Sequence, residues 1–156
     1  MRNNIARTAL VIVFFATFIL SMVPAVKAAQ CSNGGIAGDW GFTSTGTVVL
    51  AAGTIPFGAV GRLTFDVAGN IVGSQTASIN GHVAPETIKG TITVHPDCTA
   101  TASASIFEGG TLVRTTSLRA VFVANQTEFR VIFANVTLPS GGSLPTVITI
   151  EGNRLF

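Results

Sequence analysis

Apolar and polar side chains alternate along residues 58–67 in the pattern of a β-strand. Leu63, Phe65 and Val67 fall on one face of such a strand, and the polar side chains between them fall on the other. Because successive side chains of a strand point to opposite faces, this pattern predicts a strand with one buried face. The Ala-Gly-Asn sequence that follows supplies a residue for the positive φ of a tight turn. Residues 71–79 are therefore the predicted second strand of a hairpin.

The same alternation and the turn residues between its segments recur along the rest of the chain. Strands are predicted within residues 38–44, 58–67, 71–79, 86–95, 98–107, 112–124, 128–136 and 146–152. An even-numbered series of hairpins can close on itself and so remove its exposed strand edges. We therefore predict an all-β fold, an antiparallel up-and-down β-barrel of about eight strands, in a single domain of residues 29–156.

Residues 1–28 have the organisation of an export signal. A segment with two arginines precedes an apolar run at residues 9–20, and small residues follow near the expected cleavage site. Pro24 and Lys27 keep the run shorter than the ~20 apolar residues of a transmembrane helix. We expect a cleaved signal peptide, a secreted or periplasmic protein, and no stable membrane insertion after cleavage.

Removal of this segment leaves an almost neutral protein. The whole chain has nine Lys and Arg residues, seven Asp and Glu residues and a formal net charge of +2. Arg2, Arg7 and Lys27 lie in the predicted signal peptide, so six basic residues remain against seven acidic ones, a net charge of about −1. Without a basic patch, nucleic acid and anionic membranes are not expected partners.

The chain contains two cysteines, Cys31 ahead of the first predicted strand and Cys98 at the start of the fifth. Export to an oxidising compartment favours a disulfide between them, which would tie the N-terminal segment to the barrel. Two free thiols or a catalytic cysteine are the alternatives, although neither cysteine has a histidine in an activating pattern. Gln30 stands where a lipoprotein signal requires a small residue, so no lipid anchor is expected.

Four segments of the mature chain carry a family resemblance. They are CSN at 31–33, GDWGF at 38–42, LTFDVAGNIVG at 63–73 and GTITVHPDCTAT at 90–101. In these segments the chain resembles an uncharacterised family of small exported bacterial proteins, and the match extends over most of the mature chain. Its motifs are structural, so the resemblance implies the fold and export but no known activity.

The sequence Gly-Asp-Trp at residues 38–40 also resembles the G-x-W motif of calycin barrels, the lipocalins and avidins. In that family the Trp closes one end of the barrel under an Arg of the last strand, which implies such a pair between Trp40 and Arg154. Phe42 follows in the same segment and is a further candidate for closing the barrel or touching a ligand. The chain has no Tyr and no second Trp. It therefore lacks the aromatic residues that line the biotin pocket of the avidins. The resemblance implies a barrel whose interior holds one small apolar molecule.

Few side chains of the mature sequence indicate a metal-binding or catalytic site. His82 and His95, with Glu86 and Asp97 near them, lack the spacing of a metal-ligand pair, so no metal site is expected. The other carboxylates are scattered one to a strand or turn, and the motifs of nucleophilic catalysis and nucleotide binding are absent. We therefore name no catalytic residue and no cofactor.

Three arginines of the predicted strands are candidates for binding a carboxylate ligand. Arg62, Arg119 and Arg130 would do so if their side chains faced the barrel interior, and exposed positions on the outer wall are the alternative. Asn125 and Asn135 begin Asn-x-Thr sequons, which would accept sugar only in a eukaryotic secretory pathway.

Three functions remain open from the sequence. The first is binding of a small apolar or amphipathic ligand, favoured by small residues at Ala100, Ala102 and Ala104 that would leave interior volume. The second is a structural or interaction role at the cell surface, favoured by near-neutral strands rich in Thr and Ser. The third is an enzyme with few catalytic groups, such as an isomerase, in a barrel resembling those of allene oxide cyclases and dirigent proteins. The shortage of reactive groups favours a binding protein over an enzyme.

Overall fold

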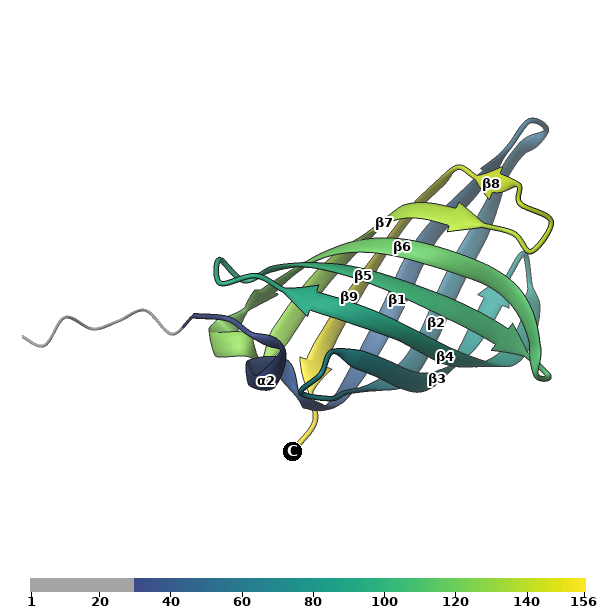
Figure 1. The fold of residues 1–156 in the computed structure, drawn as a ribbon. Coiled ribbons are helices and arrows are strands. Elements are labelled where there is room, and N and C mark those ends of the chain that lie inside the picture. The colour runs from purple at the N-terminus through teal and green to yellow at the C-terminus, as the bar shows by residue number, and fades with distance from the viewer. Residues whose placement is uncertain (1–29) are drawn as a thin grey trace, which may run out of the picture.

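The computed structural model describes residues 30–156, so the predicted signal peptide at 1–28 lies outside the described residues. The described chain consists mainly of β-strands (Figure 1). The helical elements are α2 (Asn33–Ile36) and the 3-10 turn η2 (Ala124–Gln126). The strands are β1 (Gly38–Leu50), β2 (Gly53–Phe65), β3 (Asn70–Ile79), β4 (His82–Val94), β5 (Thr99–Glu108), β6 (Thr111–Val123), β7 (Glu128–Thr137), β8 (Ser143–Leu144) and β9 (Thr146–Arg154).

The eight long strands form one closed antiparallel barrel. Strands β1 to β6 pair in sequence order, β9 pairs with β1, and β7 pairs with both β9 and β6. Each long strand therefore has two neighbours, and only the two-residue β8 lies outside the ring, paired with the end of β7. The prediction of an eight-stranded up-and-down barrel is confirmed. Closure satisfies the backbone donors and acceptors that an open sheet leaves at its edges.

Alternation places the predicted faces correctly in most strands. Phe65 is 5% exposed and packs in the core, with Leu63 against it. Val67 departs from the prediction, because β2 ends at Phe65 and the Val67 side chain is 73% exposed in the turn. Ala100 and Ala104 on β5 are buried inside the barrel.

The β1–β2 hairpin is longer than predicted. The two strands pair from Gly38 with Phe65 to Leu50 with Gly53, whereas no strand is predicted for residues 45–57 from the sequence. This segment does not alternate, because it contains a Val-Val-Leu-Ala-Ala run and a proline at position 56. The residues before Phe57 have no partner on β3. Proline is tolerated there because that edge of β2 requires no backbone N–H to donate a hydrogen bond. The hairpin tip extends beyond the other strands at one end of the barrel (Figure 1).

The opposite end of the barrel is closed by α2. Trp40 on β1 is fully buried beneath it, and its indole Nε1 donates a hydrogen bond to the carbonyl of Ile36 at 2.9 Å. Three phenylalanine rings surround the indole at centroid distances of 5.3–5.9 Å, namely Phe65, Phe122 and Phe129. Aromatic pairs at such distances add to the stability that burial alone provides. The core is therefore concentrated at this closed end.

The predicted disulfide between Cys31 and Cys98 is confirmed. Cys98, predicted as the first residue of the fifth strand, lies in the turn before β5 with a φ of 68°, so the strand begins one residue later than predicted, at Thr99. The bond joins the segment before α2 to this turn, with a Cα–Cα distance of 4.9 Å. It therefore fastens the cap of the closed end to the barrel wall.

The turn between β2 and β3 contains a carboxylate whose pKa is held below its ordinary value of 3.8. The main cause is a hydrogen bond from the Asn70 side chain to Asp66, and the backbone N–H of Asn70 adds a second. Because the ionised form is favoured in the fold, its contribution to stability is complete above pH 3.8 and is lost as the pH falls through the lowered pKa.

The variant Asp66→Asn tests this titration. We expect the wild-type protein to be more stable than the variant at neutral pH, and the difference to shrink as the pH falls below 3.8, where Asp66 becomes neutral like its amide replacement. Thermal unfolding midpoints of both proteins over a pH series measure the difference. A difference that stays constant with pH would contradict the assignment.

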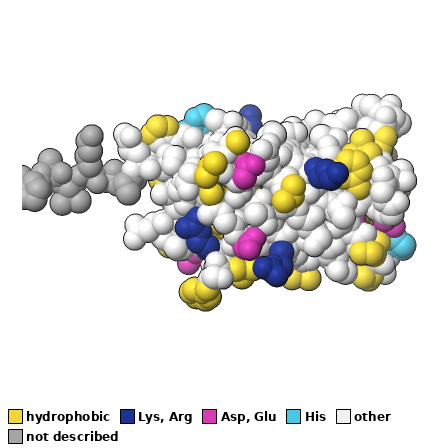
Figure 2. Space-filling view, turned by 60° about the horizontal axis from the view of Figure 1, so that its bottom comes forward, with side chains coloured by type: hydrophobic (Ala, Val, Ile, Leu, Met, Phe, Trp, Pro, Cys, Tyr) yellow, Lys and Arg dark blue, Asp and Glu magenta, His cyan; other side chains and the backbone are white. Residues whose placement is uncertain are grey.

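The outer wall carries few charges. Figure 2 shows one side of the barrel, on which a few charged side chains are scattered over a mostly uncharged surface and apolar side chains form small groups. None of the helices within residues 30–156 is long and apolar enough to span a membrane.

Candidate functional site

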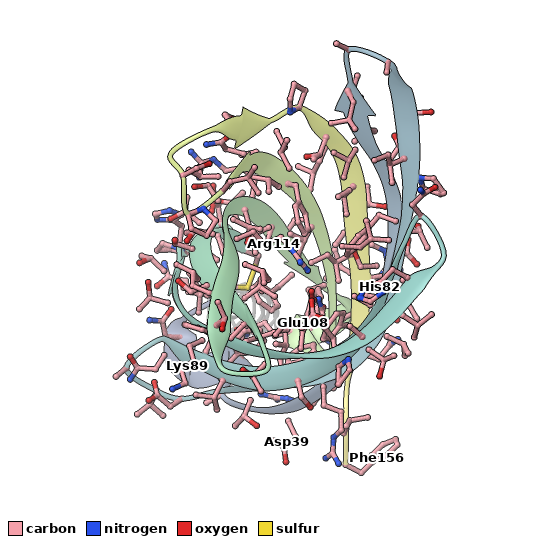
Figure 3. The ribbon with its side chains drawn as sticks, turned by 90° about the vertical axis from the view of Figure 1, so that its right-hand side faces the viewer. Asp39, His82, Lys89, Glu108, Arg114 and Phe156 are labelled. Carbon is pink, nitrogen blue, oxygen red and sulfur yellow. A yellow bond between two sulfur atoms is a disulfide. The ribbon has the colours of Figure 1, made fainter. Side chains whose placement is uncertain are left out.

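The end of the barrel opposite α2 contains a cavity of about 370 Å³, which we call the cup. Its walls are mainly apolar, and the apolar side chains lining it include Ile55, Phe57, Ile79, Phe133, Leu144 and Ile148. Three charged residues also line it, Glu86, Glu108 and Arg114. Cavities of this size with apolar walls and a few polar groups are typical of sites for small molecules. Figure 3 looks into this end and shows Arg114 and Glu108 within the ring of strands.

A row of polar side chains crosses the cup on adjacent strands. Gln75 on β3 lies directly opposite Glu86 on β4, and Glu86 lies directly opposite Glu108 on β5. Arg114 on β6 pairs with Ile106, the second residue before Glu108 on the same face of β5. Side chains two residues apart on a strand share a face, so all four positions face the interior.

The centre of this row is a buried ion pair. The Arg114 Nη1 and Nη2 atoms donate to the two carboxylate oxygens of Glu86 at 2.7 and 2.6 Å. The amide of Gln75 donates to the same carboxylate at 2.5 Å. The Glu86 side chain is 2% exposed and that of Arg114 is 12% exposed. Such a bidentate pair has a specific geometry, and its hydrogen bonds replace those that the two charged groups would make with water.

The ion pair separates the cup from a smaller cavity deeper in the barrel. That inner cavity has a volume of about 50 Å³ and is lined by apolar side chains together with Gln75, Arg114 and Thr116. Arg114 and Phe133 line both cavities. The polar row therefore forms the floor of the cup, and the packed core lies beneath it.

Glu108 lies nearer the mouth of the cup. Its side chain is 42% exposed, and the Nε2 atom of His82 lies 3.6 Å from its Oε1 atom. The His82 side chain is 73% exposed at the rim. Glu108 thus presents a carboxylate to the cup that, unlike Glu86, is not held by a guanidinium group.

The candidates taken from the calycin resemblance gather at the closed end. The Arg154 guanidinium lies 5.4 Å from the centre of the Trp40 ring, and its Nη2 donates to the carbonyls of Gly35 and Ala37. Arg154 thereby links the last strand to the cap. Phe42 is buried and lines the inner cavity, not the cup.

The other candidate arginines lie on the outer wall. The Arg62 side chain is 70% exposed, with Asp39 at 4.0 Å. Arg119 is exposed and donates to the carbonyl of Leu118. Arg130 interacts with outer-wall carboxylates of Glu128 and Glu151. Each is next to an inward-facing residue, so strand alternation turns its side chain outward.

The two histidines are apart and exposed. His82 lies at the rim near Glu108, and His95 lies in the turn before Cys98 at the closed end. Within residues 30–156, no three His, Cys, Asp or Glu side chains are grouped as metal ligands.

Sequence reasoning missed Gln75 and Arg114, and it named Glu86, the first residue of a predicted strand, only beside the histidines in a metal site that was not expected. The alternation of the strands could have identified two of these residues. Glu86 falls on the same strand face as Ile88, and Arg114 falls on the same strand face as Leu118 and Phe122. A charged side chain in the apolar phase of a strand predicts an inward-facing polar group.

Known barrels share this fold at low sequence identity. No protein-family model and no curated protein sequence matches the chain. A redesigned beta barrel, mFAP1, solved bound to DFHBI, is 20% identical with a TM-score of 0.50, and the match covers 76% of this chain and 94% of that one. A second structure, EF1p2_mFAP2b bound to DFHBI, is 15% identical with a TM-score of 0.55, covering 77% and 94%. At these identities the similarity shows the shared β-barrel fold alone.

Proposed function

We propose that this protein is an exported β-barrel that binds a small apolar molecule in the cup. The observation that carries the proposal is the 370 Å³ cavity, which is lined mostly by apolar side chains and has its polar groups confined to the floor and one side. Apolar walls provide affinity, and a few fixed polar groups orient the ligand. The similar barrels mFAP1 and EF1p2_mFAP2b are both bound to DFHBI, so this fold is compatible with a bound ligand.

Export is part of the proposal. The disulfide between Cys31 and Cys98 fits an oxidising compartment, since such bonds do not persist in most cytosols. The organisation of residues 1–28 as a signal peptide supports the same location. Mass spectrometry of protein recovered from the periplasm or the medium, with a mature N-terminus near residue 29, is the expected result. Retention of the whole chain in the cytosol would contradict it.

Blocking the cup tests ligand binding. Thr146 lines the cup, whereas the next residue, Val147, is 62% exposed on the outer wall. We expect Thr146→Trp to weaken binding of the neutral fluorophore phenylnaphthylamine at least about tenfold, equal to about 1.4 kcal/mol, because the indole occupies the cavity. Val147→Trp is the matched control and should leave the affinity unchanged. Fluorescence titration measures both.

A failure of phenylnaphthylamine to bind the wild-type protein would count against the proposal, as would equal weakening by both variants. Thermal unfolding of each variant confirms that it is folded.

A catalytic role has one observation in its favour, the presence of two carboxylates in the cup. Glu86 has both oxygens engaged by Arg114 and Gln75, so Glu108 is the carboxylate available for proton transfer. An enzyme would return its ligand chemically changed, and Glu108→Gln would stop the change. Mass spectrometry of a ligand extracted unchanged after prolonged incubation would favour binding alone.

A further inference from the structure

We infer that the cup selects apolar molecules with a positively charged head group, such as an alkylammonium, over those with a carboxylate. The inference rests on the proposed function, because it concerns the ligand class of the same cavity. It follows from the charges that face the cup and from the contacts that each of them already makes.

Among residues 30–156, Arg114 is the one Arg or Lys that lines the cup. Its two terminal nitrogens are bound to Glu86, and its guanidinium lies 5.8 Å from the centre of the Phe57 ring. A carboxylate ligand would have to displace Glu86, which binds the guanidinium in a bidentate geometry and is already desolvated in the folded protein. The guanidinium is therefore not available as an anion site.

The remaining cations of residues 30–156 are not in the cup. Lys89 lies over the Phe107 ring on the outer wall, and Figure 3 shows it outside the ring of strands. Arg154 is bound at the closed end. The other three are Arg62, Arg119 and Arg130, described above on the outer wall.

Two carboxylates and one guanidinium therefore line the cup, with a formal net charge of −1. The carboxylate without a guanidinium partner is Glu108, and the exposed imidazole of His82 lies 3.6 Å from it. Because its side chain is 42% exposed at the mouth, Glu108 can meet a ligand head group while the apolar part of the ligand enters the cup. Low-dielectric walls strengthen the interaction of such a charge with a ligand cation.

Three ligands with the same chain and different head groups test this inference. Decylamine, decanol and decanoate are titrated against the full mature protein by calorimetry, at low salt and mildly alkaline pH. We expect decylamine to bind at least tenfold more tightly than decanoate, equal to about 1.4 kcal/mol, with decanol between them. In Glu108→Gln the preference for decylamine should disappear while the affinity for decanol stays the same.

Glu151→Gln is the matched control, since it removes the same charge from the outer wall, where the Glu151 side chain is 65% exposed. It should leave all three affinities unchanged. Tighter binding of decanoate than of decylamine would overturn the inference, and so would a Glu108→Gln variant that keeps the preference. In both cases decanol still binds and the proposed function stands. If none of the three ligands binds, the proposed function itself fails.

Discussion

Replacing Arg114 with methionine is expected to lower the free energy of unfolding by about 3–5 kcal/mol. The substitution removes the guanidinium group that donates to both oxygens of Glu86. The Glu86 side chain is only 2% exposed, and the amide of Gln75 would be its remaining side-chain donor. A buried charge without its partner is costly because neither water nor another charge compensates it. Urea denaturation of the oxidised protein at neutral pH measures the loss.

Arg119→Met is the matched control for this prediction. Arg119 lies on the same strand, is exposed, and has a hydrogen bond to the carbonyl of Leu118. Its replacement should change the unfolding free energy by no more than about 0.5 kcal/mol. Combining Glu86→Leu with Arg114→Met removes both charges and should restore most of the lost stability. Equal effects of Arg114→Met and Arg119→Met would show that the ion pair does not support the fold.

The buried ion pair is not explained by stability alone. Apolar residues of similar volume are often as stabilising as a buried ion pair, or more so, since they carry no desolvation cost. The pair also lies where a cavity of about 370 Å³ meets the packed core. Exceptions to an apolar interior are expected at functional sites, where ligand chemistry and not packing selects the residue. The polar row is thus an independent reason to place function in the cup.

The fold could be predicted from the sequence because alternation is a local property. The hairpin formed by β2 and β3 follows from the pattern of residues 58–79, and its register pairs Phe65 with Ile71 across the predicted turn. The end of the β1–β2 hairpin could not be predicted in this way. Residues 48–52 are apolar without alternation. Residues 48–50 at the end of β1 are held in strand conformation by pairing with residues 53–55 of β2, and Ala51 and Ala52 form the turn. Tertiary context decided the conformation there.

The candidate site was less predictable because it depends on pairing between strands. Alternation can show that Glu86 and Arg114 face inward, but not that they meet. The register between β5 and β6 shifts between Ile106 and Phe107, and this irregularity lies directly beside Arg114. A shift of one residue changes which side chains are neighbours, and it has no clear sequence signature. The Glu86–Arg114 contact is therefore a property of the closed barrel and not of any one strand.

Removing the disulfide by the double substitution of Cys31→Ser and Cys98→Ser is expected to lower the unfolding free energy by about 4 kcal/mol. The two cysteines are 67 residues apart, so the bond closes a long loop and restricts the unfolded chain. Denaturant unfolding of the oxidised wild-type protein and the double variant measures the difference. Reductant should bring the wild-type protein towards the variant and leave the variant unchanged. A variant as stable as the oxidised protein would contradict the prediction.

Fluorescence of Trp40, the one tryptophan of the chain, separates two ways in which the bond could act. The cap has contacts of its own, because Arg154 donates to the carbonyls of Gly35 and Ala37, and Asn33 accepts from the backbone of Val94. These contacts should keep α2 over the indole when the bond is absent, so Trp40 in the folded double variant should remain as protected from acrylamide quenching as in the wild-type protein. Stability would then be lost through the greater freedom of the unfolded chain. Increased quenching in the folded variant would instead show that the disulfide holds the cap in place.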